Sequence, residues 1–297
     1  MRTILTSVTL FATSLLASPV VYVTNGMQFG AIDAGTGMFQ QIGPDYPEGS
    51  EGLALGPNGR FFAVGFSGNL FSIDPATGIT TLVGPTGMDD CSTPSSPCGR
   101  TANLTIGNFG GKLYATDFDN NLYTVDPITG AASLIGLTGI PGVPFVPGIS
   151  SDGKLNIYEQ TLFGAGGQLY STFTAFVLDL GTGSVVDMAA AAALYRIDPL
   201  TAAATLVAPL SGPNSVLAIN GIFAANGTLY GFDNFSSHVV NLDLQTGAVA
   251  FTGDVDPSAG IIRGAQAETP EPASAALTGL GLMLGSLCWR RQTKRRR

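Results

Sequence analysis

Five copies of one pattern decide the fold: AIDAGTGMFQQIG at 31–43, SIDPATGITTLVG at 72–84, TVDPITGAASLIG at 124–136, RIDPLTAAATLVA at 196–208 and NLDLQTGAVAFTG at 241–253. Each copy alternates apolar and polar residues up to an Asp, turns, and alternates again, as two half-buried strands joined by a hairpin do. Four further strand segments carry a Gly followed by a Leu-Tyr or Phe-Phe pair, at 59–62, 111–114, 167–170 and 227–230. Together these segments predict a repeated four-stranded antiparallel blade.

The turn in each copy is built around an Asp. An Asp side chain can hydrogen-bond the backbone two residues further on, Pro presets the next φ, and Gly accepts the left-handed conformation that returns the chain. We therefore interpret five residues as turn builders: Asp33, Asp74, Asp126, Asp198 and Asp243. The alternative is a ring of metal-binding carboxylates. It is disfavoured because each Asp lies in the outer hairpin of a separate blade, and we expect no metal and no cofactor.

The spacing of these Asp residues counts the blades. Successive copies are 41, 52, 72 and 45 residues apart, and a blade needs about 40 to 50 residues. The long step contains a degenerate copy, DLGTG at 179–183, which lies too close to Asp198 for four more strands. We predict an all-β propeller of about five four-stranded blades, with an extra hairpin on blade four, and keep six blades as the alternative. The pattern resembles the YVTN/NHL-like group of propellers in general terms.

The two ends of the repeat region predict how the ring closes. The first unit, 20–43, lacks an innermost strand, whereas GIIRGAQ at 260–266 resembles an inner strand with no blade after it. Pairing the two would complete blade one and lock the ring through its ends.

The C-terminus combines a Pro-Glu-Pro triplet, an uncharged run of 17 residues at 273–289, and a basic end. As a helix the run would reach about 26 Å, enough to cross a hydrocarbon core. Lys and Arg beside a span resist translocation, so the basic end should stay cytoplasmic and the bulk of the chain should lie outside. The basic end consists of Arg290, Arg291, Lys294, Arg295, Arg296 and Arg297.

This tail resembles the PEP-CTERM sorting signal of Gram-negative bacteria that make extracellular polysaccharide. The resemblance covers residues 269–297 and implies that Pro270, Glu271 and Pro272 are recognised by an exosortase-like membrane enzyme. It implies an inner-membrane anchor before processing, and then release to the cell surface or extracellular matrix. A permanent tail anchor with a chance triplet is the alternative.

The N-terminus supports export. Arg2 provides a positive start, and Ile4 to Leu16 form an apolar stretch of signal-peptide length. We expect residues 1–18 to be a signal peptide cut after Ala17 or Ser18 and residues 19–268 to be the propeller domain. Leu15 and Leu16 are poor residues for a cleavage site, so an uncleaved anchor is the alternative.

The charge of the propeller domain limits its partners. Between Pro19 and Glu268 there are six basic and 20 acidic residues, a difference of −14. Such an acidic domain is not expected to bind nucleic acid, whose phosphates need Lys and Arg. Cations, neutral glycans and proteins remain compatible partners.

The cysteines fit an oxidising compartment. Cys91 and Cys98 bracket a short Ser/Pro loop, and we expect a local disulfide between them. A zinc site would need more Cys or His nearby, and His238 is the only histidine in the chain.

Sequence motifs for catalysis are scarce. The chain has no serine nucleophile elbow, no Walker-type phosphate loop and no paired-His zinc motif. Asp117, Asp119 and Asn121 alternate as calcium ligands do, but the pattern departs from an EF-hand, and we interpret it as a hairpin turn. We therefore expect an exported, non-enzymatic surface or matrix protein. A glycan- or protein-binding propeller is the alternative, and a lactonase- or lyase-type propeller enzyme is a third.

Overall fold

The computed structural model describes residues 20–33, 35–88, 105–117, 119–141, 148–150, 152–214, 216–225 and 227–267. Helical structure in these ranges comprises two single 3-10 turns, η1 at Pro57–Gly59 and η2 at Pro257–Ala259. None of the helices described there is long and apolar enough to span a membrane. The predicted signal peptide, the cysteine loop and the C-terminal tail lie outside the described residues.

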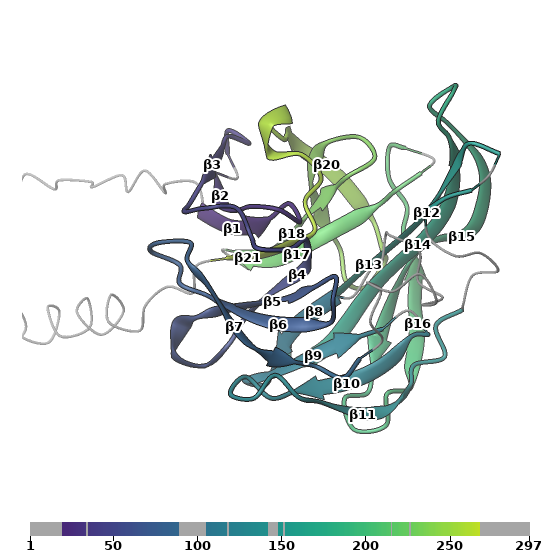
Figure 1. The fold of residues 1–297 in the computed structure, drawn as a ribbon. Helices are drawn as coiled ribbons and strands as arrows, with labels where there is room; N and C mark the ends of the chain where they lie inside the picture. Colours follow the sequence, from purple (N-terminus) through teal and green to yellow (C-terminus); the bar gives the residue numbers. More distant parts are fainter. Residues whose placement is uncertain are drawn as a thin grey trace, which may run out of the picture.

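Five antiparallel sheets are arranged around one axis (Figure 1). Blade one consists of β21 (Gly264–Ala267), β1 (Val20–Thr24), β2 (Phe29–Asp33) and β3 (Phe39–Gln41). Blade two consists of β4 (Ser50–Leu55), β5 (Phe61–Gly65), β6 (Asn69–Ile73) and β7 (Thr80–Pro85). Blade three consists of β8 (Thr105–Phe109), β9 (Lys112–Thr116), β10 (Asn121–Val125) and β11 (Ala132–Leu137).

The remaining blades follow the same strand order, from the axis outward. Blade four consists of β13 (Lys154–Ala165), β14 (Gln168–Asp179), β15 (Ser184–Ile197) and β16 (Ala204–Pro209). Blade five consists of β17 (Ile219–Ala225), β18 (Thr228–Asp233), β19 (His238–Leu242) and β20 (Val249–Asp254). The prediction of five four-stranded blades is confirmed, and the alternative of six is wrong.

The ring closes through its two ends. β21 pairs antiparallel with β1, with Val21 opposite Ala267 and Thr24 opposite Gly264. The five innermost strands then contact one another in a closed circle, β21 to β4, β8, β13, β17 and back to β21. This confirms the predicted closure. We call the side where the inner strands begin the upper face and the side where they end the lower face, so the first and last described residues both lie at the lower end of blade one.

Apolar side chains fill the space between each pair of neighbouring blades. One cluster joins blades one and two through Phe29, Phe61 and Ile73, and another joins blades five and one through Val23, Phe223 and Phe232. Three more clusters occupy the junctions of blades two and three, three and four, and four and five. The core is therefore a ring of interblade layers rather than one central core.

The insertion in blade four lengthens its strands. β13 and β14 have 12 residues each and β15 has 14, and a two-residue strand, β12 (Gly148–Ile149), pairs with β13. The degenerate copy at Asp179 makes the turn between β14 and β15. The insertion thus belongs to blade four as predicted, but it extends an existing hairpin instead of adding a new one. Figure 1 shows this hairpin projecting from the ring.

The five repeat Asp residues lie in the turns between the third and fourth strands of their blades. The Asp243 Oδ1 accepts hydrogen bonds from the backbone N–H groups of Gln245 at 2.8 Å and Thr246 at 2.9 Å. Equivalent bonds to the residue two positions on hold the turns at Asp33, Asp74, Asp126 and Asp198. Backbone donors lower the pKa of Asp126, Asp198 and Asp243, since they stabilise the charged form.

In four of the five turns the fourth residue after the Asp is a Gly that also joins neighbouring blades, whereas blade four has Ala202 there, at a φ of +67°. A Cβ on Gly78 of blade two would lie 1.8 Å from the Ile42 carbonyl oxygen of blade one, and a Cβ on Gly130 would lie 2.6 Å from that of Gly84 in blade two. Gly37 and Gly247 approach the preceding blades at Asp254 and Pro209 in the same way. Each of these four glycines also has a positive φ, so both the backbone conformation and the close approach of the neighbouring blade favour Gly there.

Candidate functional site on the propeller axis

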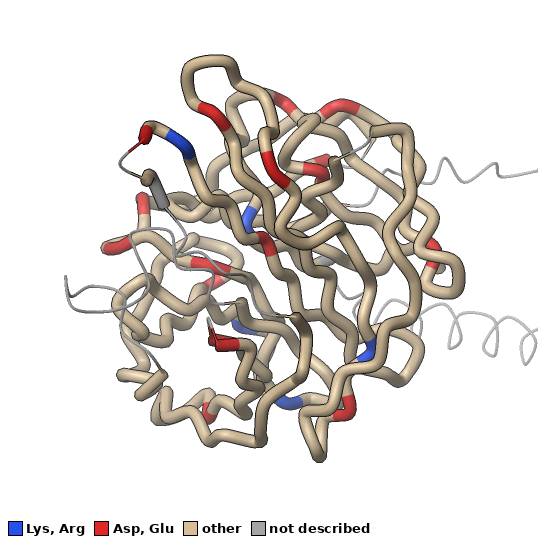
Figure 2. The backbone as a smooth tube through the Cα atoms, turned by 90° about the vertical axis from the view of Figure 1, so that its right-hand side faces the viewer, with Lys and Arg blue, Asp and Glu red and all other residues tan. Residues whose placement is uncertain are grey.

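Charged residues are sparse along the backbone (Figure 2), yet the side chains of three of them meet at the axis near the upper face. Arg263 immediately precedes β21, Glu51 is the second residue of β4, and Glu159 lies in β13. The Arg263 guanidinium forms a salt bridge with Glu51, and the Asn220 side-chain amide of β17 donates a hydrogen bond to Glu159. Four inner strands or their flanks therefore supply one polar cluster, which we call the axial clasp.

Further buried polar side chains continue the axial clasp toward blade three. The Thr161 hydroxyl donates to the Asn220 Oδ1 at 2.7 Å, and the Thr116 hydroxyl donates to the Gln160 Oε1 at 2.9 Å. The Tyr158 hydroxyl donates to Asn120 at 2.9 Å. Because buried polar groups are costly when unpaired, this network favours one arrangement of the inner strands.

The charge balance of the axial clasp is unequal. Glu51 is 4% exposed and Glu159 is 9% exposed, and one guanidinium can neutralise only one of these carboxylates. Burial raises the pKa of both carboxyls, and the charge of Arg263 only partly opposes this effect. The charge of Glu51 raises the pKa of Arg263, which stays protonated. At neutral pH, protonation of at least one of the two carboxyls, Glu51 or Glu159, is therefore favoured.

The contacts of the axial clasp are mostly internal. Glu51 is bound to Arg263 and Glu159 to Asn220, so both carboxyls already have partners within the fold. Among the described residues, no group of three or more His, Cys, Asp or Glu is arranged to hold a metal ion. The arrangement can brace blades one, two, four and five against one another.

A pocket of about 280 Å³ opens below the clasp, toward the lower face. All five inner strands line it, and its walls include Leu53, Leu162 and Phe223. Asn108 and Gln266 contribute side-chain amides, and none of the described residues that line the pocket is charged. The Asn108 amide donates to the Leu55 carbonyl oxygen at 2.6 Å, which fixes its orientation. A small, uncharged ligand matches this lining.

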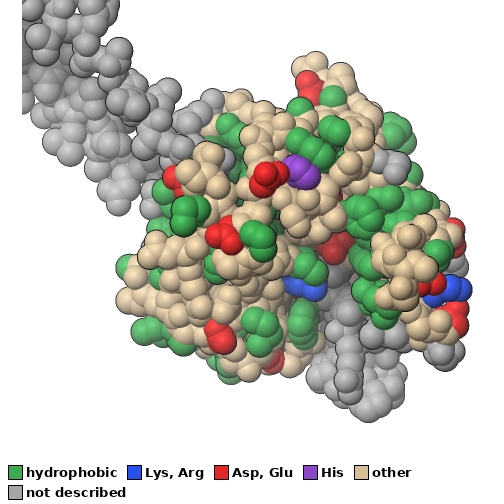
Figure 3. All heavy atoms as spheres, turned by 90° about the horizontal axis from the view of Figure 1, so that it is seen from above, with side chains coloured by type: hydrophobic (Ala, Val, Ile, Leu, Met, Phe, Trp, Pro, Cys, Tyr) green, Lys and Arg blue, Asp and Glu red, His purple; other side chains and the backbone are tan. Residues whose placement is uncertain are grey.

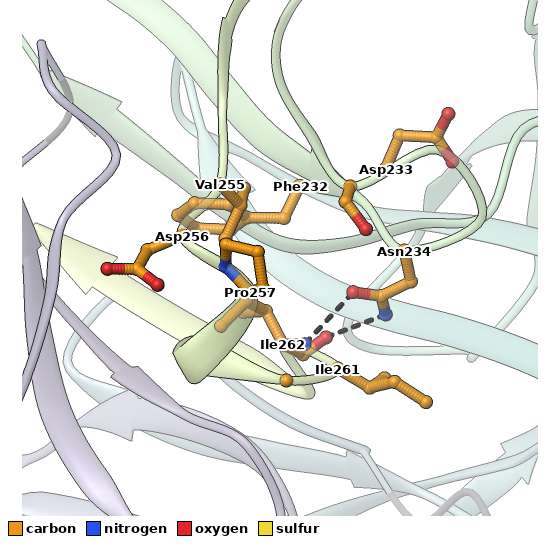
Figure 4. Close-up of a pocket in the computed structure, with 10 residues that line it drawn as sticks. Phe232, Asp233, Asn234, Val255, Asp256, Pro257, Ile261 and Ile262 are labelled. Carbon is orange, nitrogen blue, oxygen red and sulfur yellow. Dashed lines mark hydrogen bonds between the residues drawn. The ribbon is translucent and has the colours of Figure 1, made fainter.

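A second hollow, of about 270 Å³, lies between blade five and the segment that leads into β21 (Figure 4). The Asn234 side chain turns toward Ile262, accepting from its N–H at 2.9 Å and donating to its carbonyl at 2.8 Å. The Asp233 carboxylate accepts the N–H of Ala218 and the hydroxyl of Ser236. These polar groups hold the closing segment against blade five.

His238 begins β19, at the end of the strand that reaches the upper face, and the histidine side chain, purple in Figure 3, has an acidic side chain beside it. Its Nδ1 is 2.9 Å from the Ser236 Oγ, and its Nε2 is 3.3 Å from the Asp254 carboxylate. Ser, His and Asp are the groups of a hydrolytic triad, but the ring nitrogens are exchanged, since the serine of a triad bonds Nε2 and its Asp bonds Nδ1. However, the Ser236 hydroxyl donates to Asp233 at 2.5 Å, and the side chain of Asp254 is 89% exposed rather than buried behind the histidine. The geometry fits a capped hairpin turn stacked on Phe251.

Asp117 and its neighbours form another turn. The Asp117 carboxylate accepts hydrogen bonds from the Asn121 N–H, the Asn121 amide and the Tyr123 hydroxyl. These donors occupy the oxygens that a calcium ion would need, and Asp119 points to solvent as an exposed residue.

Several predicted sites lie outside the described residues. They are the sorting triplet, the basic end and the Cys91–Cys98 pair. The axial clasp was not predicted from the sequence. One signal was present: Glu159 is a charged residue inside the otherwise uncharged strand segment LNIYEQTLFGA, where a buried role can be expected.

Comparisons with known proteins bear on the fold alone. No protein family and no curated protein matches the sequence. Among solved structures, the nidogen/laminin complex matches at 10% identity with a TM-score of 0.48, over 84% of this chain and 98% of that one. A Bacteroides caccae protein of unknown function matches at 12% identity with a TM-score of 0.42, over 84% of this chain and 99% of that one. Virginiamycin B lyase from Staphylococcus aureus matches at 15% identity with a TM-score of 0.39, over 75% of this chain and 63% of that one. At this level of similarity, none of these transfers an activity.

Proposed function

We propose that this protein is an exported, non-catalytic propeller that is held at the inner membrane by residues 269–297 and is then released to the cell surface or extracellular matrix. The observation that carries the proposal is the position of the chain ends. Val21 and Ala267 are paired on blade one at the lower face, so a tail can leave the ring next to the exported N-terminus. Removing that tail would take no strand from any blade.

The hydrogen-bond partners of the polar groups on the axis and at His238 support a non-catalytic role. The axial clasp groups bind one another, and the Ser236 hydroxyl is committed to Asp233. A general acid or base must reach a substrate proton within hydrogen-bond distance, and the buried Glu51 and Glu159 face their own partners instead.

The sorting role has a direct test in the native host. We expect Glu271→Ala to keep the protein in the membrane fraction, because the resemblance assigns Glu271 to recognition by the exosortase-like enzyme. Glu268→Ala is the matched control, since it removes the same charge three residues away and should be released like the wild type. Fractionation with immunoblotting measures both. Equal release of the two variants would contradict a role for the triplet.

The pocket below the axial clasp favours a second role, the binding of a neutral extracellular glycan or protein segment. All five inner strands converge on it, and its lining is uncharged. We expect Ala224→Arg, at an exposed residue that lines the pocket, to abolish retardation of the protein in gels containing the host's own extracellular polysaccharide. Ala250→Arg, at an exposed position of the outer strand of the same blade, is the control. Unchanged retardation of the Ala224 variant would place binding elsewhere.

A further inference from the structure

Two amide side chains bring hydrogen-bonding groups to the pocket below the axial clasp. Among the described residues that line it, Asn108 and Gln266 alone carry polar side chains, and both are half-buried. Asn108 donates one N–H to the Leu55 carbonyl oxygen, and within the described part of the chain its Oδ1 accepts no hydrogen bond. The Gln266 amide forms no hydrogen bond there either, and neither group is sealed from solvent. A ligand in the pocket can therefore use an acceptor on Asn108 and both functions of the Gln266 amide.

Backbone groups of the inner strands add to these amides. β4, β8, β17 and β21 are end strands of their sheets, and β13 pairs with β12 at Leu155 and Asn156, outside the pocket lining. The axial side of each strand therefore has N–H and C=O groups that its own sheet leaves unpaired at the pocket. Uncharged donors and acceptors alternate along such an edge. The ligand group that matches them best is an amide, which carries both a donor and an acceptor.

The apolar part of the lining is fixed in place. Phe163 stacks on Tyr170 with ring centroids 5.7 Å apart, and Phe223 stacks on Tyr230 with centroids 5.3 Å apart. Both Phe side chains are almost fully buried, and they line the pocket together with Leu53. A rigid apolar wall beside amide groups suits a ligand that joins a methyl group to an amide.

Three other classes of ligand match this lining less well. An unmodified hexose carries a hydroxyl on most of its carbons, and each hydroxyl that the apolar wall leaves unpaired costs free energy. A uronic acid or a free amino sugar is charged, and none of the described lining residues carries the opposite charge. A purely apolar side chain of a protein would leave the two amides of the pocket unpaired.

The position of the pocket limits how a polymer can reach it. Glu51 and Asn220 of the axial clasp precede the lining residues Leu53 and Ile222 by two positions on the same strands, so the clasp lies at the inner end of the pocket. A ligand therefore enters from the lower face. The volume of about 280 Å³ is just below the usual range of ligand pockets, about 300–1,000 Å³, and suits one projecting group rather than a stretch of chain.

We propose that the pocket below the axial clasp binds the acetamido group of an N-acetylhexosamine residue in a neutral glycan. The inference rests on the glycan-binding role proposed above and names the class of sugar for it. The acetamido N–H is donated to the Asn108 Oδ1, and the acetamido oxygen accepts from the Gln266 amide. The acetyl methyl group lies against the rings of Phe163 and Phe223.

The test compares three identically linked trisaccharides, of N-acetylglucosamine, of glucose and of glucosamine. Saturation-transfer NMR follows their binding to the full-length chain in a polyoxyethylene detergent, which contains no sugar. We expect the N-acetylglucosamine trisaccharide to bind at least about tenfold more tightly than the other two, with the largest saturation on its acetyl methyl protons. Salt at about 0.15 M limits the general attraction of the cationic glucosamine trisaccharide to the acidic domain.

Variants of the pocket locate the acetamido group. Gln266→Leu removes one amide and keeps a side chain of similar size, so we expect it to weaken binding of the N-acetylglucosamine trisaccharide about three- to tenfold. Gln40→Leu, at an exposed position of β3 in the same blade, is the matched control and should bind like the wild type. Ala224→Arg should abolish binding. Urea unfolding of each variant, matched to the wild type, shows that a loss of binding is not a loss of fold.

The outcomes separate this inference from the glycan-binding role on which it rests. Equal affinity for the glucose and N-acetylglucosamine trisaccharides would overturn the inference and leave the role intact. So would a lack of binding to all three, if the host's polysaccharide still retards the wild type but not Ala224→Arg. Binding that Gln266→Leu and Ala224→Arg leave unchanged would also overturn it, because the acetamido site would lie elsewhere. Pocket-dependent binding of the N-acetylglucosamine trisaccharide, without retardation by the host's polysaccharide, would support the inference and contradict the role for that polymer.

Discussion

Replacing Gly78 by Ala is expected to lower the free energy of unfolding by about 3 kcal/mol or more. The residue has a φ of +66°, and a Cβ there would lie 1.8 Å from the Ile42 carbonyl oxygen and 2.5 Å from its carbon. The left-handed backbone alone costs an L-residue about 1–2 kcal/mol. Overpacking against a fixed backbone adds about 1–3 kcal/mol, because blades one and two must move apart. Urea unfolding followed by fluorescence measures the change.

Gly59→Ala separates the two contributions. Gly59 has a φ of +70°, and nothing lies within 4 Å of a Cβ built on it. We expect the free energy of unfolding of this variant to fall by only about 1 kcal/mol. The left-handed backbone destabilises the folded state, and the lower conformational entropy of the unfolded chain offsets part of that loss. Equal losses for Gly59→Ala and Gly78→Ala would mean that the turn glycines serve local conformation alone and do not join the blades.

Glu159→Gln is expected to make the protein more stable than the wild type at pH 8 and about equally stable at pH 5. Burial raises the pKa of Glu159 from 4.5 to about 7. A raised pKa means that the folded state holds its proton more tightly, so the stabilisation is present below about pH 4.5 and is lost as the pH rises through about 7. Gln keeps an acceptor for Asn220 and cannot ionise.

The expected gain at pH 8 is about 1–3 kcal/mol. One pKa unit corresponds to about 1.4 kcal/mol. Relaxation of the protein around the buried carboxylate, together with the positive charge of the nearby Arg263, makes the gain smaller than the pKa shift alone would give. Denaturant unfolding at several pH values between 5 and 9 measures it. Asp187→Asn, which neutralises an exposed carboxylate on the same blade, is the control and should follow the wild-type profile. If the free energy of unfolding of Glu159→Gln fell with pH as steeply as that of the wild type, ionisation of Glu159 would not destabilise the fold.

Local features of this fold were predictable from the sequence. The hydrogen bonds of the turn Asp residues run to the backbone two or three residues away, so a five-residue pattern contains everything they need. The closure of the ring followed from counting strands, because the first unit lacked an inner strand and 260–266 supplied one. Both are consequences of the repeat itself.

Features that depend on several blades were not predictable in the same way. Glu51, Glu159 and Arg263 are far apart in the sequence and none belongs to the repeat pattern, so only the circular arrangement of the inner strands brings them together. The second role of Gly78 was missed because its positive φ already explained the residue. The insertion in blade four was located correctly, but whether it would add a hairpin or lengthen one depended on pairing that the pattern does not encode.

The intact mass of the extracellular protein from the native host decides whether the tail is a processed sorting signal. We predict a polypeptide that ends near Pro270 to Pro272, with the apolar run and the basic end removed and all five blades retained. A mass that still includes Leu277 to Arg297 would contradict it, because the protein would then be permanently anchored in the membrane rather than released by a sorting signal.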